Sequence, residues 1–240
     1  MNLNSLKPLP PNNVLLKLKV QNDKILLKSG GFLYIDTSFN EYEHTETIAE
    51  VIKVPPVCRY RDPITGDGLW HEWPIEVEVG DTVYCHYLAI QSTLKKKYDG
   101  KSFVIKGKHD NEKGDIYCII HYHRNIFMVY RNGQYIPIND YLIVERGNTE
   151  TVTPGGLIIP ESVQKSEREK LKWGTVLYAG KNLSSPLQEG FSDEDLHVGS
   201  KVFFHPSADI PLEYKDHQTF LPGRDILRIR RTDIWYVEND

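Results

Sequence analysis

The stretch PINDYLIVE at residues 137–145 has a near copy, PPNNVLLKL, at residues 10–18. Each begins with a proline and a polar turn and continues as a short run rich in aliphatic residues, a pattern typical of a strand that is entered from a turn. Because recurrence along a chain is the first sign of a repeated structural unit, this pair predicts that one fold occurs twice.

Four further pairs extend the repeat in the same order. No single pair is convincing, because short strand sequences resemble one another by chance, but five pairs in one order indicate a duplication. The offset between partners shrinks from about 127 to about 108 residues, so the first copy carries the longer insertions. The further pairs are GGFLYID (30–36) with GGLIIPE (155–161), AEVIKV (49–54) with GTVLYA (174–179), VGDTVY (79–84) with VGSKVF (198–203), and RNIFMV (124–129) with TDIWYV (232–237).

We therefore expect two domains, residues 1–132 with two insertions and residues 133–240. The short turn RNGQ between them indicates close coupling without a flexible linker. No long stretch keeps a helical period with caps, which predicts an all-β chain of small barrels or sandwiches. Strands are expected at VLLKLKV (14–20), TIAEVIKV (47–54), DTVYCHYLAI (81–90), SFVIKG (102–107), DIYCIIHYH (115–123), IFMVY (126–130), DYLIVER (140–146), WGTVLYAG (173–180), SKVFFH (200–205), DILRIRR (225–231) and DIWYVE (233–238).

Composition and charge exclude several classes of protein. The chain of 240 residues has a net charge of −4, which argues against a dedicated nucleic-acid-binding protein. Its apolar runs are too short to span a bilayer, and the start, MNLNSLKPLPPNN, lacks the apolar segment of a signal peptide. Cys58, Cys85 and Cys118 are scattered and form no CxxC pair, as expected for reduced thiols. We therefore expect a cytoplasmic protein that binds neither nucleic acid nor membranes.

Catalytic and metal-binding motifs find little support in the sequence. It contains no GxSxG, no P-loop and no GxGxxG motif. His121 and His123 could lie on one face of a strand and, with Cys85, His86 and Cys118, could form a zinc site. No two of these residues form a paired motif with typical zinc-site spacing, so we interpret them as partly buried strand residues and predict no metal.

The sequence TPGGLIIPESVQKSEREK, residues 153–170, places three aliphatic residues between two glycines and a long charged run. Gly155 and Gly156 give the backbone conformational freedom, and Pro160 limits continuation of Leu157–Ile159 into a regular element. One interpretation is a buried edge strand after a Gly-Gly turn. The other is a loop that offers its tripeptide in extended form to a partner, since its flanks have little apolar area with which to fold alone. The pattern alone leaves both open.

The order of these blocks resembles the GroES co-chaperonin family, also called chaperonin-10, over nearly all of residues 134–240. The resemblance is specific because it combines several motifs in one order. PINDYLIVER is similar to the family's opening strand, TVTPGGLIIPESVQKSEREK to its mobile loop, WGTVLYAG to the strand that ends in an AxG turn, VGSKVFFH to the VGDxVxF strand, and DILRIRRTDIWYVE to the closing pattern.

The first copy keeps the order of the blocks but departs from the family's pattern. Its tripeptide, Phe32–Tyr34, has two aromatic residues around Leu33 and could bind the same partner as the second loop or pack on its own barrel. Its insertion at 55–78 is rich in aromatic residues and could form an interface or fold over its own barrel. Its insertion at 91–114 carries a cluster of lysines, which is either a solvated face or a site for an acidic partner.

The resemblance implies a fold of two tandem GroES-like small β-barrels. It also implies that a disordered loop folds on contact with the apical domains of a GroEL-type chaperonin, where its apolar tripeptide enters a groove between two helices. Rings of such domains enclose non-native client proteins, and the chaperonin alone hydrolyses ATP, so we expect no enzyme and no cofactor in this chain. The residues expected to bind the chaperonin are Gly155, Gly156, Leu157, Ile158 and Ile159, and secondarily Phe32, Leu33 and Tyr34.

A fusion of two barrels raises a question of symmetry, because seven barrels cannot be made from whole chains of two. Three or four chains would give a ring of six or eight barrels, an arrangement similar to the tandem co-chaperonins of chloroplasts. Alternatively, only the second copies form a sevenfold ring. A second hypothesis is a GroES-like structural or binding module of a virus or a bacterial assembly, without a chaperonin cycle.

Overall fold

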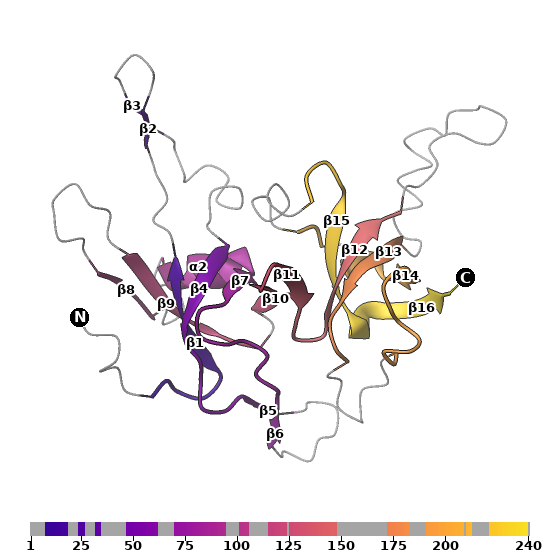
Figure 1. Cartoon of the computed structure of the whole chain (residues 1–240), viewed down its shortest axis with the longest axis horizontal. Coiled ribbons are helices and arrows are strands. Elements are labelled where there is room, and N and C mark those ends of the chain that lie inside the picture. Colours follow the sequence, from indigo (N-terminus) through magenta and orange to yellow (C-terminus); the bar gives the residue numbers. More distant parts are fainter. Residues whose placement is uncertain are drawn as a thin grey trace. The chain divides into compact units, whose positions relative to one another are not determined.

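The structure, a computed structural model, divides into two compact units, the first ending at Gln134 and the second beginning at Tyr135. Each unit is built on an antiparallel β-sheet (Figure 1). The prediction of an all-β, GroES-like fold is confirmed, with one short helix as the exception described below. The structure describes residues 8–18, 24–26, 32–34, 47–61, 70–94, 101–105, 115–123, 125–147, 172–182, 191–208, 210–212 and 221–239.

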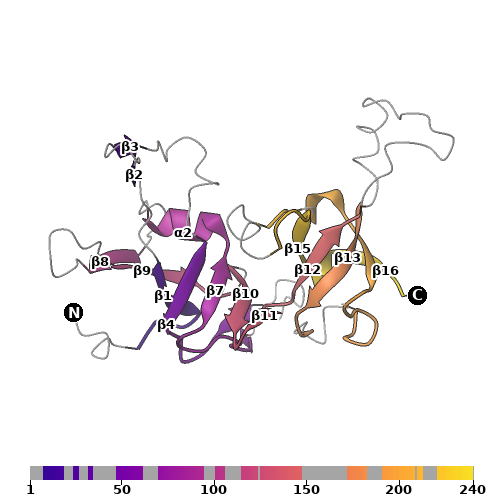
Figure 2. The ribbon, with the colours of Figure 1, turned by 45° about the horizontal axis from the view of Figure 1, so that its top comes forward.

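The second unit contains a five-stranded sheet with the order β15-β12-β13-β14-β16. Two 3-10 turns, η4 (Pro206–Ala208) and η5 (Arg231–Asp233), follow β14 and β15. Figure 2 shows β12, β13 and β15 of this unit side by side. The strands are β12 (Tyr141–Arg146), β13 (Lys172–Ala179), β14 (Lys201–Phe204), β15 (Ile226–Arg230) and β16 (Ile234–Glu238).

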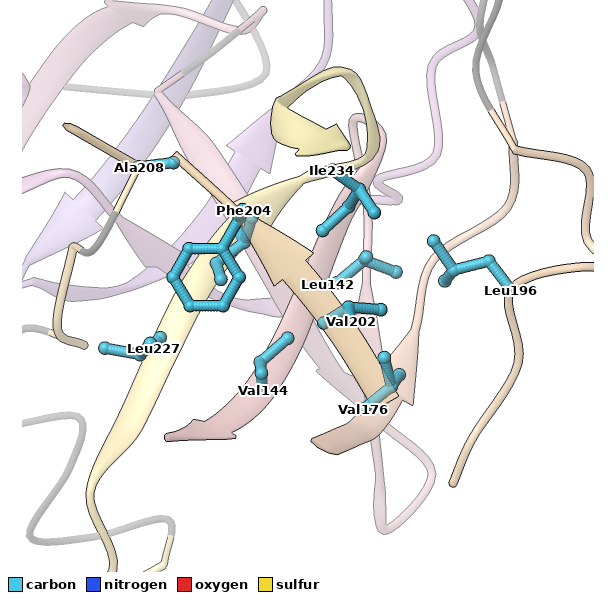
Figure 3. Packing of buried hydrophobic residues seen from close by; sticks show 10 residues of the cluster. Leu142, Val144, Val176, Leu196, Val202, Phe204, Ala208, Leu227 and Ile234 are labelled. Carbon is cyan, nitrogen blue, oxygen red and sulfur yellow. The ribbon is translucent and has the colours of Figure 1, made fainter. Parts of the chain in front are cut away.

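All five strands of the second unit contribute side chains to one hydrophobic core (Figure 3). The alternation of a β-strand sends Val202 and Phe204 into this core, while Lys201 and Phe203 point to the other face. Because both edge strands share the core, the sheet curls around it. The buried members are Leu142, Val144, Val176, Leu196, Val202, Phe204, Ala208, Leu227, Ile229 and Ile234.

A seven-stranded sheet has its strands in the order β11-β10-β7-β4-β1-β9-β8, all in the first unit except β11, which begins at the last residue before the second unit. The first unit also contains two separate hairpins, β2-β3 and β5-β6. Its one described helix, α2 (Tyr87–Leu94), follows β7. The sheet strands are β1 (Asn13–Leu18), β4 (Ile48–Lys53), β7 (Thr82–Cys85), β8 (Lys101–Ile105), β9 (Asp115–His121), β10 (Ile126–Arg131) and β11 (Gln134–Pro137). The hairpin strands are β2 (Lys24–Leu26), β3 (Phe32–Tyr34), β5 (Arg59–Arg61) and β6 (Trp70–Glu72).

Five strands of the first unit repeat the order of the second unit: β9-β1-β4-β7-β10 corresponds to β15-β12-β13-β14-β16. The residue pairing corresponds as well, since Ala49 pairs with Val83 as Gly174 pairs with Val202. The irregularities in pairing correspond too. The register shifts within the β1-β4 pair and within the matching β12-β13 pair. It also shifts within the β7-β10 pair and within the matching β14-β16 pair. We call residues related by this pairing matched positions.

The turn before β7 and the turn before β14 also correspond. Gly80 and Gly199 have φ of +94° and +96°, a left-handed conformation that favours glycine. The N–H of Gly80 donates to the oxygen of Val51 at 2.8 Å, and that of Gly199 to the oxygen of Val176 at 2.9 Å. The two VG motifs of the sequence therefore form the same turn against the same neighbouring strand.

The prediction of a single strand over residues 81–90 is wrong in its second half. Strand β7 ends at Cys85, and α2 begins at Tyr87. The oxygen of His86 accepts the N–H of Ala89 at 3.0 Å, and its ring Nδ1 accepts the N–H of Leu88 at 3.1 Å. His86 thus satisfies the first turn of the helix, which the alternation of apolar residues in YCHYLAI does not reveal.

The described part of the 55–78 insertion packs on its own unit. Trp73 is buried, and its ring centroid lies 4.3 Å from that of His123. Its backbone N–H donates to the carbonyl oxygen of Cys58 at 2.8 Å. The N–H of Glu76 donates to the hydroxyl of the buried Tyr122 at 2.9 Å. Trp70, at the far end of the β5-β6 hairpin, is 58% exposed. For Trp73, the alternative of folding over its own unit is therefore correct.

In the described part of the chain, no helix has the length and hydropathy needed to cross a membrane.

Candidate functional site

The predicted loop of the second unit lies between β12 and β13. Its residues Gly155, Gly156, Leu157, Ile158 and Ile159 fall outside the described residues. The structure does describe the two strand ends from which the loop segment 148–171 departs and to which it returns. The geometry of the site is therefore the geometry of this loop base.

The two ends of the loop segment are held side by side by backbone pairing. Arg146 pairs with Gly174 across β12 and β13, and the N–H of Gly147 donates to the oxygen of Trp173 at 2.9 Å. On the other side of β12, the N–H of Arg146 donates to the oxygen of Asp225 at 2.8 Å, and the two side chains form an ion pair at 3.0 Å. The loop base is thus fixed from both neighbouring strands.

Both glycines at this base are required by close approach. A Cβ added at Gly174 would lie 2.5 Å from the carbonyl oxygen of Glu145 and 2.5 Å from Cγ1 of Val144. A Cβ added at Gly147 would lie 2.2 Å from Cδ2 and Cε2 of the Trp173 indole. A larger residue at either position would push the strand ends or the indole apart.

The predicted contacts of the first unit, Phe32, Leu33 and Tyr34, form strand β3. Their backbone pairs antiparallel with β2, Phe32 with Leu26, Leu33 with Ile25 and Tyr34 with Lys24. This hairpin lies within the segment between β1 and β4, which matches the loop segment between β12 and β13. Their side chains fall outside what the structure describes.

An exposed aromatic face on β14 and β16 was not anticipated from the sequence. Trp235 and Tyr236 are 60% and 58% exposed. The ring of Tyr236 lies 5.6 Å from that of Phe203, and the ring of Trp235 lies 5.3 Å from that of His205. The adjacent aromatic residues in DIWYVE were a signal for this face, because neighbours on a strand point to opposite faces of a sheet, and one face of this sheet packs on the hydrophobic core.

The matched positions in the first unit differ in exposure. Phe127 matches Trp235 and is 1% exposed, and Met128 matches Tyr236 and is 0% exposed. Tyr84, which matches Phe203, is also buried. The same face of the repeated sheet is therefore covered in the first unit and open in the second.

Arg231 is a second residue that sequence reasoning missed. It is 1% exposed, and its Nη2 lies 2.6 Å from the oxygen of Gly180 and 2.6 Å from Oδ1 of Asp193. Its Nη1 donates to the oxygen of Phe191 at 3.1 Å. Arg231, in the turn before β16, thus contacts the segment that connects β13 with β14 at two places, at Gly180 directly after β13 and at Phe191 and Asp193 farther along. Nothing in the sequence RIRR, residues 228–231, distinguishes Arg231 from the other two arginines.

Cys85, His86, Cys118, His121 and His123, the residues weighed above as a possible zinc site, form no metal-binding group in the described part of the chain. Within that part, no group of three or more His, Cys, Asp and Glu side chains could hold a metal ion. Cys58, Cys85 and Cys118 are buried free thiols. Burial raises the pKa of the Cys58 thiol to about 11 and that of the Cys118 thiol to about 12. Both thiols are therefore protonated at neutral pH, a state that is a poor nucleophile.

Comparison with known proteins identifies the second unit. The family of the chaperonin 10 kDa subunit matches residues 134–229. The co-chaperonin GroES of Pelobacter propionicus is 33% identical over 102 residues, which cover 42% of this chain and 94% of that protein. GroES of Syntrophotalea carbinolica is 36% identical over 85 residues, 34% of this chain and 83% of that protein. GroES of Citrifermentans bemidjiense is 34% identical over 98 residues, 41% of this chain and 90% of that protein.

These relatives match nearly their whole length to less than half of this chain, so the comparison evidences one GroES domain. The family is non-enzymatic, which confirms the prediction that the chain is not an enzyme. The match includes the loop base at Gly147 and Trp173 and the strands on either side of it. By its sequence and its sheet, this chain belongs to the GroES co-chaperonin family, also called chaperonin-10.

Proposed function

We propose that this chain is a tandem co-chaperonin, which docks on a GroEL-type chaperonin and assists the folding of non-native client proteins in the cavity beneath it. The observation that carries the proposal is the match of the second unit to the family over residues 134–229, with the GGLII sequence between the paired ends of β12 and β13. In this proposal Leu157, Ile158 and Ile159 enter the chaperonin groove, and Gly155 and Gly156 give the loop its freedom.

The first unit is, in this proposal, a divergent GroES-like domain. Its support is the repeated strand order and pairing, down to the two shifts of register. The hairpin β2-β3 carries Phe32–Tyr34 at the place of the second loop, so these residues are proposed as a second, weaker chaperonin contact. Several loops of modest affinity would together give avidity while letting the cap leave in each cycle.

Assembly into a homo-oligomeric ring is supported by the open side of the second sheet. Edge strand β15 is flanked by Ile210–Leu212, since the N–H of Arg228 donates to the oxygen of Ile210 at 3.0 Å. Among the described residues, no strand covers the outer edge of β16, which carries Trp235 and Tyr236. An uncovered edge with exposed aromatic residues is the kind of surface that another chain covers. We propose a second copy of this chain as that partner.

The proposed function is tested by capture on a purified GroEL-type chaperonin in the presence of ATP. The wild type is expected to bind, and a Leu157→Ser/Ile158→Ser variant to lose most of its binding, because the apolar contacts are removed. A matched control, Val198→Ser/Ile210→Ser, makes the same kind of change at residues that are 62% and 40% exposed outside the loop, and is expected to bind as the wild type does.

A wild type that fails to bind would contradict the chaperonin function and leave a GroES-like binding module without a chaperonin cycle. Equal binding by the wild type and the loop variant would show that the tripeptide is not the contact. A Phe32→Ser/Leu33→Ser variant tests the first loop in the same assay. A partial loss is expected, because the second loop remains intact.

A further inference from the structure

The indole of Trp173 rests on Gly147 at the point where the loop segment leaves the second sheet. Gly147 is the last described residue before the segment, and Lys172 is the first after it. The indole occupies the space that a Cβ of residue 147 would need. Gly147 is not among the residues with left-handed φ, so glycine is required here for space and not for backbone conformation. We call this arrangement the Trp173 seat.

The position of the indole is fixed by its neighbours on β14. Phe203 is the cross-strand partner of Trp173. The Nζ of Lys201 lies 5.2 Å from the centroid of the Trp173 ring and 5.2 Å from that of Phe203, within reach of a cation–π interaction. The same Nζ forms an ion pair with Glu238 at 2.8 Å. Lys201 is thereby anchored beside the indole.

The Trp173 seat is not required to build the repeated sheet. Trp173 is half-buried and does not belong to the hydrophobic core of the second unit. At the position matched to Trp173 the first unit has Ile48. Leu18 pairs with Ala49 as Arg146 pairs with Gly174, so in sequence Lys19 takes the place of Gly147. The repeated sheet therefore forms in the first unit with neither residue of the seat. This points to a role tied to the second loop.

We propose that the Trp173 seat is a positioning device for the chaperonin-binding loop. This inference rests on the proposed function. The seat and the hydrogen bond from Gly147 N–H to Trp173 O hold together the two strand ends that residues 148–171 connect. A segment whose two ends are held together samples fewer conformations when unbound, so it loses less conformational entropy when it binds a partner. Trp173 and Gly147 act through the loop and do not themselves contact the chaperonin.

The proposal is tested by measuring chaperonin binding and thermal unfolding for a double-mutant cycle. Gly147→Ala places a methyl group where the indole lies, and Trp173→Ala removes the indole; each is expected to weaken binding by roughly tenfold, because the loop must be ordered from a wider ensemble. The double variant is expected to bind no more weakly than Trp173→Ala, since without the indole the methyl group meets no obstacle. Trp173→Phe keeps a flat ring over Gly147 and is expected to restore most of the affinity.

A direct readout that needs no chaperonin is the hydrogen exchange of the Gly147 amide. It donates to the oxygen of Trp173 and is expected to exchange faster in both single variants. Trp70→Ala, which removes an exposed indole from the first unit, is the matched control and is expected to change neither binding nor this exchange rate.

Additive losses in the double variant would overturn the proposal, as would unchanged binding by Gly147→Ala. A loss of binding that merely follows a lowered unfolding midpoint would also overturn it, because the seat would then be only structural. If the wild type itself does not bind a chaperonin, the proposed function is wrong, and the exchange rate of Gly147 still decides whether the seat fixes the loop base.

Discussion

Asp81, in the turn before β7, shows how one side chain supports the repeated fold. It is 6% exposed, and both of its oxygens accept hydrogen bonds from Arg131, at 2.8 and 2.5 Å. The N–H of Glu78 also donates to it at 2.7 Å. Ser200 takes the matched place in the second unit, where its hydroxyl accepts the N–H of His197 at 3.1 Å. One turn is thus stabilised by a charge in one unit and by a hydroxyl in the other.

The Asp81–Arg131 pair predicts a loss of stability in acid. Burial acts to raise the pKa of the Asp81 carboxyl, but the hydrogen bonds from Arg131 and Glu78 and the charge of Arg131 outweigh it and lower the pKa below 3.8. A lowered folded-state pKa means that the pair's contribution is complete above about pH 4 and is lost as the pH falls through the folded-state value. Glu78, which also pairs with Arg131 at 2.9 Å, is the other charge at this site.

Asp81→Asn is expected to lower the stability of the first unit at pH 7 and to flatten its dependence on pH below about 4. Urea denaturation at a series of pH values measures both effects. Glu72→Gln, which changes an exposed carboxylate in the Arg59 ion pair, is the control and is expected to change stability by less than about 1 kcal/mol. An acid dependence as steep in Asp81→Asn as in the wild type would contradict the assignment.

At the scale of elements, Arg231 connects three parts of the second unit. It follows β15 directly, and it bonds to Gly180 after β13 and to Asp193 before β14. Its N–H donates to the oxygen of Asp140, whose carboxylate lies 3.7 Å from Nε. These contacts hold the connection between β13 and β14 against the start of β12 and the end of β15.

Arg231→Ala is therefore expected to destabilise the second unit by about 3 kcal/mol, since it removes a buried cation that lies beside the carboxylate of Asp140 and the carbonyl of Gly180. Chemical denaturation of the full chain measures this as a lower midpoint. Arg224→Ala removes an exposed ion pair with Glu145 and serves as the control, with an expected change of less than about 1 kcal/mol. Equal effects of the two substitutions on the unfolding midpoint would show that the buried contacts of Arg231 do not stabilise the second unit.

For the whole molecule, the two copies of the sheet have different surroundings. Phe127 and Met128 are buried in the first, while the matched Trp235 and Tyr236 are exposed in the second. Because this face of the sheet is buried in the first unit and exposed in the second, each chain has one such face available for association. This is the face on which we propose that a second copy docks.

The substitution Trp235→Ser/Tyr236→Ser is expected to shift the protein toward smaller species, because it removes the apolar surface available for association. Sedimentation velocity over a range of protein concentrations measures the shift. Trp70→Ser, at an exposed tryptophan of the first unit, is expected to leave the distribution unchanged. A wild type that sediments as a monomer at every concentration would contradict assembly through this face.

The sequence by itself determined the all-β fold and the resemblance to GroES, because strand periodicity, VG turns and block order are local patterns. The Asn132-Gly133 turn is another example, since both residues take the positive φ that a two-residue hairpin requires. Only the tertiary structure decided the helix after Cys85, the burial of Arg231, the exposure of Trp235 and the seat of Trp173 on Gly147. Each depends on neighbours from distant parts of the chain, and such contacts leave no periodic signal in the sequence.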